Sequence, residues 1–110
     1  MTEWKLADGL LVVSPSGKLD SGNTEAFEKV LLAQMDVNIR GVVFDFSNLD
    51  YISSAGLRVI LRTLKQSQAQ GLRFMLVGLN ATVREIFEIS GFLAYFKVFC
   101  TVGEALQSGS

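Results

Sequence analysis

The chain has 110 residues, of which 49% are hydrophobic and 19% charged, and its formal net charge is −1. This length and composition fit one globular domain with a real core and exclude a disordered chain. Lys and Arg are scattered along the chain and form no basic block, so we expect no nucleic-acid partner. No apolar stretch approaches the ~18 residues of a membrane span, and residues 1–5 lack the apolar run of a secretory signal. We therefore expect no membrane insertion and a cytoplasmic location.

The chain also lacks the side chains that most enzymes use. It has no histidine and a single cysteine, Cys100, which excludes Ser-His-Asp and Cys-His nucleophiles and the common zinc sites. Neither of the common glycine-rich phosphate-binding motifs is present. A carboxylate site for Mg²⁺ or Ca²⁺ stays open, although there is no EF-hand loop. We expect a protein that is not an enzyme, with no catalytic residues, metal ligands or cofactor of its own. Cys100 follows an apolar run and is expected to be buried and inert.

The first predicted elements form a hairpin. Two short strands, 4–6 and 10–14, flank Ala7-Asp8-Gly9, which has the composition of a tight turn. Trp4 is expected to anchor the first strand. Pro15 cannot donate a hydrogen bond to a sheet, so it belongs at a strand end or edge.

A helix is predicted over 24–35, with Ser21 or Asn23 as its N-cap. The side chains expected to face the core recur at helical spacing: Phe27, Val30 and Leu31.

The middle of the chain predicts a central strand and a long helix. Residues 41–46 are almost continuously apolar, as in a strand covered on both faces. Residues 47–52 are expected to be a loop. A helix over 55–69 follows and ends before Gly71. Its apolar stripe consists of Leu57, Ile60, Leu61 and Leu64, and its opposite side carries Arg58, Arg62 and Lys65.

The last third continues the alternation of strand and helix. The pattern predicts a strand over 72–77, a helix over 81–89 capped by Asn80, a strand over 94–99 and a short helix over 101–107. This order predicts an α/β fold, with a mixed, mostly parallel sheet of four to five strands covered by about four helices. A single domain is expected over 1–110, with an ordered core over about 1–105 and a frayed end over 106–110.

The loop before the long helix is the candidate functional segment. It follows a buried strand, and sites in open α/β sheets form at the carboxyl ends of strands. Ser54 is expected to be the N-cap of the helix. Ala55 and Gly56 are small and are expected to leave room for another protein, which would explain a helical glycine that costs about 1 kcal/mol relative to Ala. The alternative is that Ser54 is a helix cap with no regulatory role.

Residues 45–57, Asp-Phe-Ser-x-Leu-x-Tyr-Ile-x-Ser-Ala-Gly-Leu, resemble the signature loop of STAS domains, specifically bacterial anti-sigma-factor antagonists. Three further segments resemble the same family: the Gly-x-Leu-Asp at 17–20, the strand at 71–77 and the helix and glycine turn at 83–92. The resemblance spans nearly the whole chain. It implies a single STAS domain.

The resemblance also implies a switch. Ser54 would be phosphorylated by a partner that is both an anti-sigma factor and a serine kinase of the histidine-kinase-like ATPase type. The unphosphorylated chain would bind that partner and free the sigma factor, and the phosphorylated chain would be released. A separate serine phosphatase would reset the switch, and ATP and Mg²⁺ would belong to the kinase.

One position departs from the family pattern. Many members carry Asp immediately before the phosphorylated serine, where this chain has Ser53. Ser53 is therefore a second candidate for phosphorylation. Ser47 is a weaker one, expected instead to stabilise its turn. The candidate partner-binding residues are Asp20, Ser53, Ser54, Ala55, Gly56 and Arg58.

Two of these residues have open roles. Arg58, one turn after Ser54, could reach the phosphate or be an ordinary solvated side chain. Asp20 is expected at the same end of the sheet as Ser54, where it could contact the kinase or simply belong to the start of the first helix. Two alternative functions share the fold: a non-phosphorylated regulatory subunit of a membrane transport ATPase, and a scaffold in a sensory complex.

Overall fold

A computed structural model describes residues 2–35 and 38–107, and its centre is a five-stranded sheet in the order β1-β2-β4-β6-β7. The strands are β1 (Thr2–Ala7), β2 (Leu10–Pro15), β4 (Gly41–Asp45), β6 (Arg73–Val77) and β7 (Lys97–Phe99). The β1–β2 pair is antiparallel and every other neighbouring pair is parallel. The predicted mixed, mostly parallel sheet is confirmed.

The hairpin of β1 and β2 follows from its turn. Asp8 and Gly9 both have positive φ, 54° and 79°, as in the type I′ turn that matches the twist of paired strands. Trp4, opposite Val13 in the register, packs its ring 5.8 Å from that of Phe27. The expected anchoring role of Trp4 is therefore confirmed.

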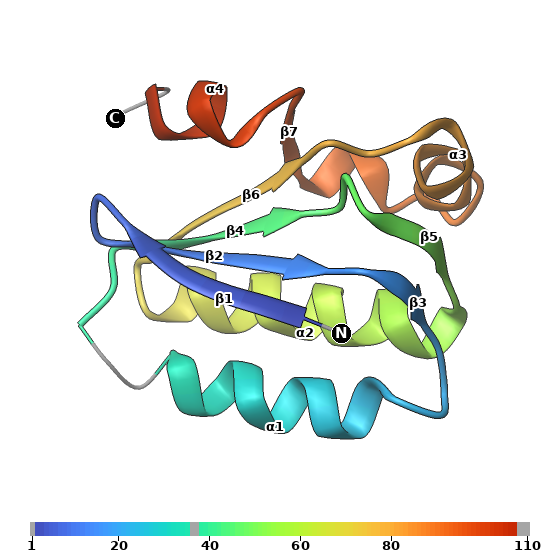
Figure 1. Cartoon of the computed structure of the whole chain (residues 1–110), viewed down its shortest axis with the longest axis horizontal. Helices are drawn as coiled ribbons and strands as arrows, with labels where there is room; N and C mark the ends of the chain where they lie inside the picture. The colour runs from blue at the N-terminus through green and yellow to red at the C-terminus, as the bar shows by residue number, and fades with distance from the viewer. Residues whose placement is uncertain (1, 36–37, 108–110) are drawn as a thin grey trace.

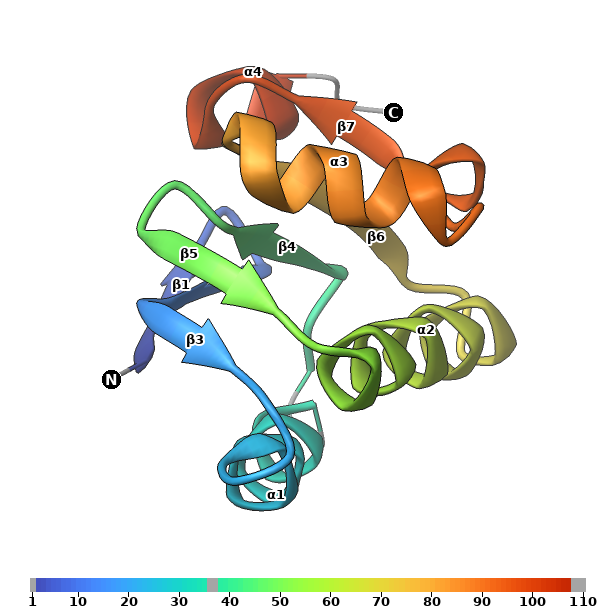
Figure 2. The ribbon, with the colours of Figure 1, turned by 90° about the vertical axis from the view of Figure 1, so that its right-hand side faces the viewer.

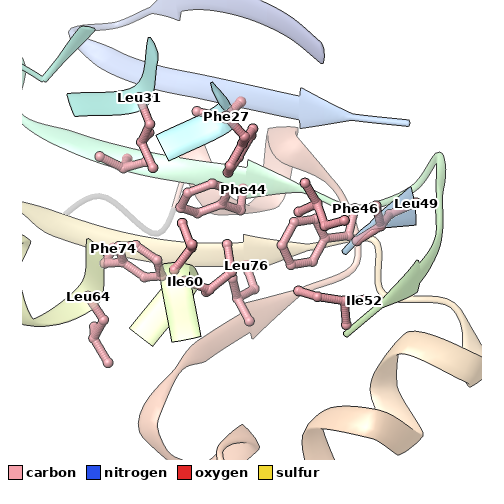
Figure 3. Packing of buried hydrophobic residues seen from close by; sticks show 14 of the residues in the cluster. Phe27, Leu31, Phe44, Phe46, Leu49, Ile52, Ile60, Leu64, Phe74 and Leu76 are labelled. Atoms are coloured by element: carbon pink, nitrogen blue, oxygen red, sulfur yellow. The ribbon is translucent and has the colours of Figure 1, made fainter. Parts of the chain in front are cut away.

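Helices cover both faces of the sheet, as Figure 1 shows. Helices α1 (Thr24–Gln34) and α2 (Ser54–Ala69) lie on one face, and α4 (Val102–Gln107) lies on the other. Beneath α1 and α2, Phe44 is the hub of an aromatic cluster, with ring centroids 5.3 Å from Phe74 and 5.7 Å from Phe46 (Figure 3). On the other face Val43 and Met75 are buried under α4. Burial on both faces explains the continuous apolar run at 41–46.

A second, two-stranded sheet was not predicted. It pairs β3 (Gly17–Leu19) with β5 (Leu49–Ile52) in parallel, with Leu19 opposite Ile52. The expected loop over 47–52 is therefore wrong over its last four residues, which form β5. Only Leu49 and Ile52 of β5 are buried, and two apolar positions are too few to show a strand period. Figure 2 shows β3 leading into α1 and β5 leading into α2, so this small sheet sets where both helices begin.

The remaining predicted boundaries are mostly confirmed. Asn80 caps α3 (Ala81–Ile89), its side chain accepting a hydrogen bond from the Val83 amide at 2.8 Å. Gly71, at φ 72°, follows the end of α2. The strand expected over 94–99 is only partly right, because η1 (Leu93–Tyr95), a 3₁₀ turn, takes up its first residues before β7.

Two expectations about burial are wrong. Val30 is 43% exposed, because it lies at the rim of a hollow beside Trp4 while Phe27 and Leu31 reach the core. Cys100 is exposed, since it lies in the bend between β7 and α4 rather than inside a strand. Of the end expected to fray, 106–107 belong to α4 and 108–110 lie outside the described residues.

Candidate functional site

Ser53, not Ser54, is the N-cap of α2. Its backbone is extended, with φ −86° and ψ 175°, and its hydroxyl accepts a hydrogen bond from the Gly56 amide at 3.3 Å. The Ser53 amide donates to the Leu19 carbonyl at 2.8 Å, which holds this residue in line with β5. The expectation that Ser54 is the cap is wrong, because either of two adjacent serines can cap a helix and the strand pairing that selects Ser53 was not foreseen.

Ser54 is instead the first helical residue, and its side chain is exposed. Within the described part of the chain its hydroxyl makes no hydrogen bond, whereas the half-buried Ser53 hydroxyl is engaged with Gly56. The first amide groups of a helix have no intrahelical acceptor. The Ser54 hydroxyl therefore stands in solvent beside a helix end that favours negative charge.

Gly56 is buried inside the fold. A Cβ atom there would lie 2.6 Å from Ile52 Cγ1 and 3.0 Å from the Leu19 carbonyl oxygen. The glycine is thus required by the close packing of α2 against β3 and β5. The expectation that Gly56 leaves room for a partner is wrong. Ala55 is half-buried and lines the groove between α1 and α2.

A hollow of about 250 Å³ lies beside Ser54, between α2 and the end of α3. Its polar lining residues are Ser54, Arg58 and Ser90, and its apolar ones are Leu57, Leu61 and Phe92. Arg58 is exposed, and no ion pair or hydrogen bond of its side chain occurs among the described residues. Its guanidinium is therefore available to an anion at this end of the helix.

The cations expected along α2 have different surroundings. Arg62 makes a bidentate contact with Glu28 of α1, at 2.7 Å from Nη2 and 2.9 Å from Nε. These hydrogen bonds raise the pKa of the Arg62 guanidinium above its ordinary value. All three side chains are exposed, but Arg62 ties α1 to α2 through Glu28, whereas the described residues include no ion pair of Arg58 or Lys65.

Asp20 lies at the same end of the fold as Ser54, as expected. It follows β3, and the carbonyl of the last residue of β3, Leu19, accepts a hydrogen bond from the Ser53 amide. Its carboxylate accepts a hydrogen bond from the Gly22 amide at 2.9 Å, so it stabilises the turn before α1. Asn23 occupies the N-cap position of α1, but its side-chain oxygen accepts from the Asp20 amide rather than from the helix. A contact between Asp20 and a partner stays a prediction.

Ser47 has the expected turn role. Its amide and hydroxyl both donate to Asp45 Oδ1, at 3.0 Å and 2.7 Å. This fixes the loop between β4 and β5 and leaves the Ser47 hydroxyl engaged.

Sequence reasoning missed the wall of the hollow that faces Ser54 from the end of α3. Ser90 and Phe92 come from the turn after α3, far from Ser54 in sequence. In the sequence, the Ser-Gly-Phe turn stands out only as part of the family resemblance at 83–92. Within 2–35 and 38–107, no group of three or more acidic or cysteine side chains is placed to hold a metal ion. None of the helices described is long and apolar enough to cross a membrane.

Comparison with known proteins places this arrangement in a family. BtrV of Bordetella bronchiseptica, named as a candidate anti-sigma factor antagonist, is 51% identical over 92 residues, which cover 83% of this chain and 78% of BtrV.

A crystal structure of a candidate anti-sigma factor antagonist from Thermotoga maritima superposes with a TM-score of 0.92 at 23% identity, covering 97% of this chain and 92% of that one. SpoIIAA, solved in an unphosphorylated form, has a TM-score of 0.83 at 22% identity, covering 98% and 95%. The Bacillus SpoIIAA structure in the phosphorylated form has a TM-score of 0.75 at 20% identity, covering both chains fully. These three structural likenesses show the fold. The STAS domain family matches residues 2–105. This chain belongs to the STAS domain family.

Proposed function

We propose that this chain is an anti-sigma factor antagonist whose affinity for its anti-sigma factor is switched by phosphorylation of Ser54. The observation that carries the proposal is that the two adjacent serines have different structural roles. Ser53 holds the helix start through Gly56, and Ser54 presents an exposed hydroxyl beside it. The 51% identity to a relative named as a candidate anti-sigma factor antagonist supports the antagonist part of the proposal.

The geometry also bears on the missing aspartate. Asp and Ser are both preferred N-cap residues, because each has a side-chain oxygen that accepts a helix amide. Ser53 does this through Gly56, so the exchange of Asp for Ser keeps the helix start intact. We therefore propose Ser54, rather than Ser53, as the phosphorylated residue.

Phosphorylation would act on the binding surface rather than on the fold. The phosphate would add about −1.5 to −2 charge at neutral pH, at a helix end where an anion is favoured. Burying that charge against a partner with no matched cation costs several kcal/mol. A loss of about 3 kcal/mol would weaken binding more than a hundredfold.

Arg58 and Asp20 would have different parts in this surface. Arg58 shares the hollow with Ser54 and can pair with the phosphate. Asp20 is bonded within the turn before α1, and we assign it the role of shaping the surface next to Ser53 and Ala55.

The partner would be an anti-sigma factor that is also a serine kinase of the histidine-kinase-like ATPase type. It would bring the ATP and Mg²⁺, while a separate serine phosphatase would restore the free hydroxyl. This chain would then act as a binding module in the cytoplasm and need no catalytic residue, metal or cofactor.

Capture from the native extract tests the proposal, using wild type, Ser54→Ala, Ser54→Asp and the control Ser53→Ala. We expect wild type and Ser54→Ala to retain an ATPase that phosphorylates wild type but not Ser54→Ala, and Ser54→Asp to lose it. Intact mass and peptide mapping locate the phosphate. Retention of one partner by all four chains, with no phosphate on Ser54, would refute the switch. If that partner were a transport ATPase or a larger sensory assembly, the corresponding alternative function would replace it.

A further inference from the structure

The hollow beside Ser54 is one end of a longer groove. It shares Leu61 and Phe92 with a second hollow, which in turn shares Gln68 and Tyr95 with a third hollow at the edge strand β7. We name this continuous depression the α2–η1 groove. It follows α2 from Ser54 to Gln68, a distance of about 21 Å at 1.5 Å per residue.

The groove has an apolar floor. Leu61 and Phe92 are half-buried along it, and Tyr95 is 63% exposed at its side. The Phe92 and Tyr95 rings lie 6.4 Å apart. Aromatic and leucine side chains that stay partly open to water in a concave surface are typical of a site for the apolar face of a helix.

The charged residues along the groove all have one sign. The three hollows include Arg58, Lys65, Arg73 and Lys97 in their walls, and no Asp or Glu is among these described lining residues. The chain as a whole has 10 basic and 11 acidic residues, so this local excess of positive charge runs against the overall composition. An occupant with carboxylates would be drawn to it.

We propose that the α2–η1 groove binds an acidic amphipathic helix, and, resting on the proposed function, that the anti-sigma factor supplies this helix. Its apolar side would lie on Leu61, Phe92 and Tyr95, and its carboxylates would face Arg58, Lys65 and Lys97. A helix of about 14 residues would match the length of the groove.

The same arrangement explains the sign of the switch. Ser54 and Arg58 lie together at one end of the groove. A phosphate on Ser54 would occupy Arg58 and place about two negative charges where the acidic helix must enter. Phosphate and partner would compete for the same cation, so phosphorylation would weaken binding most strongly at low salt.

Two synthetic peptides of about 14 residues test the groove without the partner. Both carry Leu on one face, and the other face is Glu in one peptide and Lys in the other. In an NMR titration, we expect the Glu peptide to shift the amides of Leu61, Lys65 and Tyr95 and the Lys peptide to leave them unchanged. Equal shifts with both peptides, or shifts only elsewhere, would overturn the proposal. Shifts at these amides on raising the protein concentration alone would show that a second copy fills the groove, and would also overturn it.

Charge reversal then connects the groove to the partner. The double variant Lys65→Glu and Lys97→Glu should weaken both the Glu peptide and the captured anti-sigma factor at least about tenfold, which is roughly 1.4 kcal/mol. The control, Lys5→Glu with Lys29→Glu, makes the same charge change at exposed residues outside the groove lining and should bind as wild type. If the anti-sigma factor binds both double variants equally, the groove proposal fails and the proposed function stands. If the Glu peptide binds as expected but no anti-sigma factor is captured, the groove stands and the proposed function fails.

Discussion

At the scale of single residues, the start of α2 separates a structural serine from an exposed one. The Ser53 hydroxyl accepts from Gly56, and its amide donates to Leu19. The Ser54 hydroxyl is exposed. The sequence alone could not assign these roles, because both serines are suitable N-cap residues. The hydrogen bond that selects Ser53 is made to Leu19 of β3, a strand that the sequence pattern does not reveal.

The capping role predicts an asymmetry in stability. Ser53→Ala should lower the free energy of unfolding by about 1 kcal/mol, because the Gly56 amide loses its acceptor. Ser53→Asp should keep the wild-type value, since Asp caps equally well. Ser54→Ala should stay within about 0.5 kcal/mol of wild type. Urea unfolding of the three variants measures this, and a larger loss for Ser54→Ala than for Ser53→Ala would contradict the assignment.

Gly56 gives a second prediction at this scale. Gly56→Ala should gain up to about 1 kcal/mol of helix propensity. It should nevertheless lower the free energy of unfolding by about 1 to 2 kcal/mol overall, because the new methyl group would press on the Leu19 backbone and on Ile52. Urea unfolding measures the net effect. A stabilised Gly56→Ala protein would show that α2 does not pack as closely as described.

At the scale of elements, the small β3–β5 sheet connects the site to the rest of the fold. The side chain of Asn80 links β5 to α3 through two hydrogen bonds. Its amide nitrogen donates to the Leu49 carbonyl at 2.7 Å, and its oxygen caps α3. Two elements that flank Ser54 in space therefore depend on one side chain.

The bridging role predicts a loss larger than that of a simple cap. Asn80→Ala should lower the free energy of unfolding by about 2 kcal/mol, because it removes a cap and leaves the Leu49 carbonyl without its donor. Asn48→Ala, in the exposed turn before β5, is the matched control and should change it by less than about 0.5 kcal/mol. Hydrogen exchange would also be expected to speed up in both β5 and α3. Equal stability of the two variants would show that Asn80 does not join these elements.

The long elements were predictable, and the short ones were not. The hairpin, β4, α2 and α3 carry enough periodic or turn-forming residues to be placed from sequence. The strands β3 and β5 and the turn η1 are only three or four residues long. Whether such a short segment forms a strand or a turn depends on its tertiary contacts rather than on its local sequence pattern. The family resemblance located the site through its loop motif, but the wall that Ser90 and Phe92 add to the hollow beside Ser54 depends on the three-dimensional fold.

At the scale of the whole molecule, the fold should tolerate the phosphate. Ser54 belongs to neither hydrophobic cluster and is exposed at the end of a helix. Phosphorylation would move the net charge from −1 toward roughly −3, and helix-end attraction should offset part of the added repulsion.

This predicts equal or slightly greater stability for the phosphorylated chain. Its free energy of unfolding should match or exceed that of the unphosphorylated chain by up to about 1 kcal/mol at low salt, and the difference should shrink as salt screens the helix end. Urea unfolding at two salt concentrations measures it. A phosphorylated chain that unfolds more easily by several kcal/mol would mean that the switch acts by melting α2.

The most direct test of the switch is the affinity of the purified chain for its captured anti-sigma factor, measured before and after stoichiometric phosphorylation with the phosphate mapped by mass. We predict that the phosphate lies on Ser54 and weakens binding more than about a hundredfold, and that phosphatase treatment restores the original affinity. Unchanged affinity with a phosphate on Ser54, or weakened affinity with the phosphate on Ser53, would contradict the proposed switch.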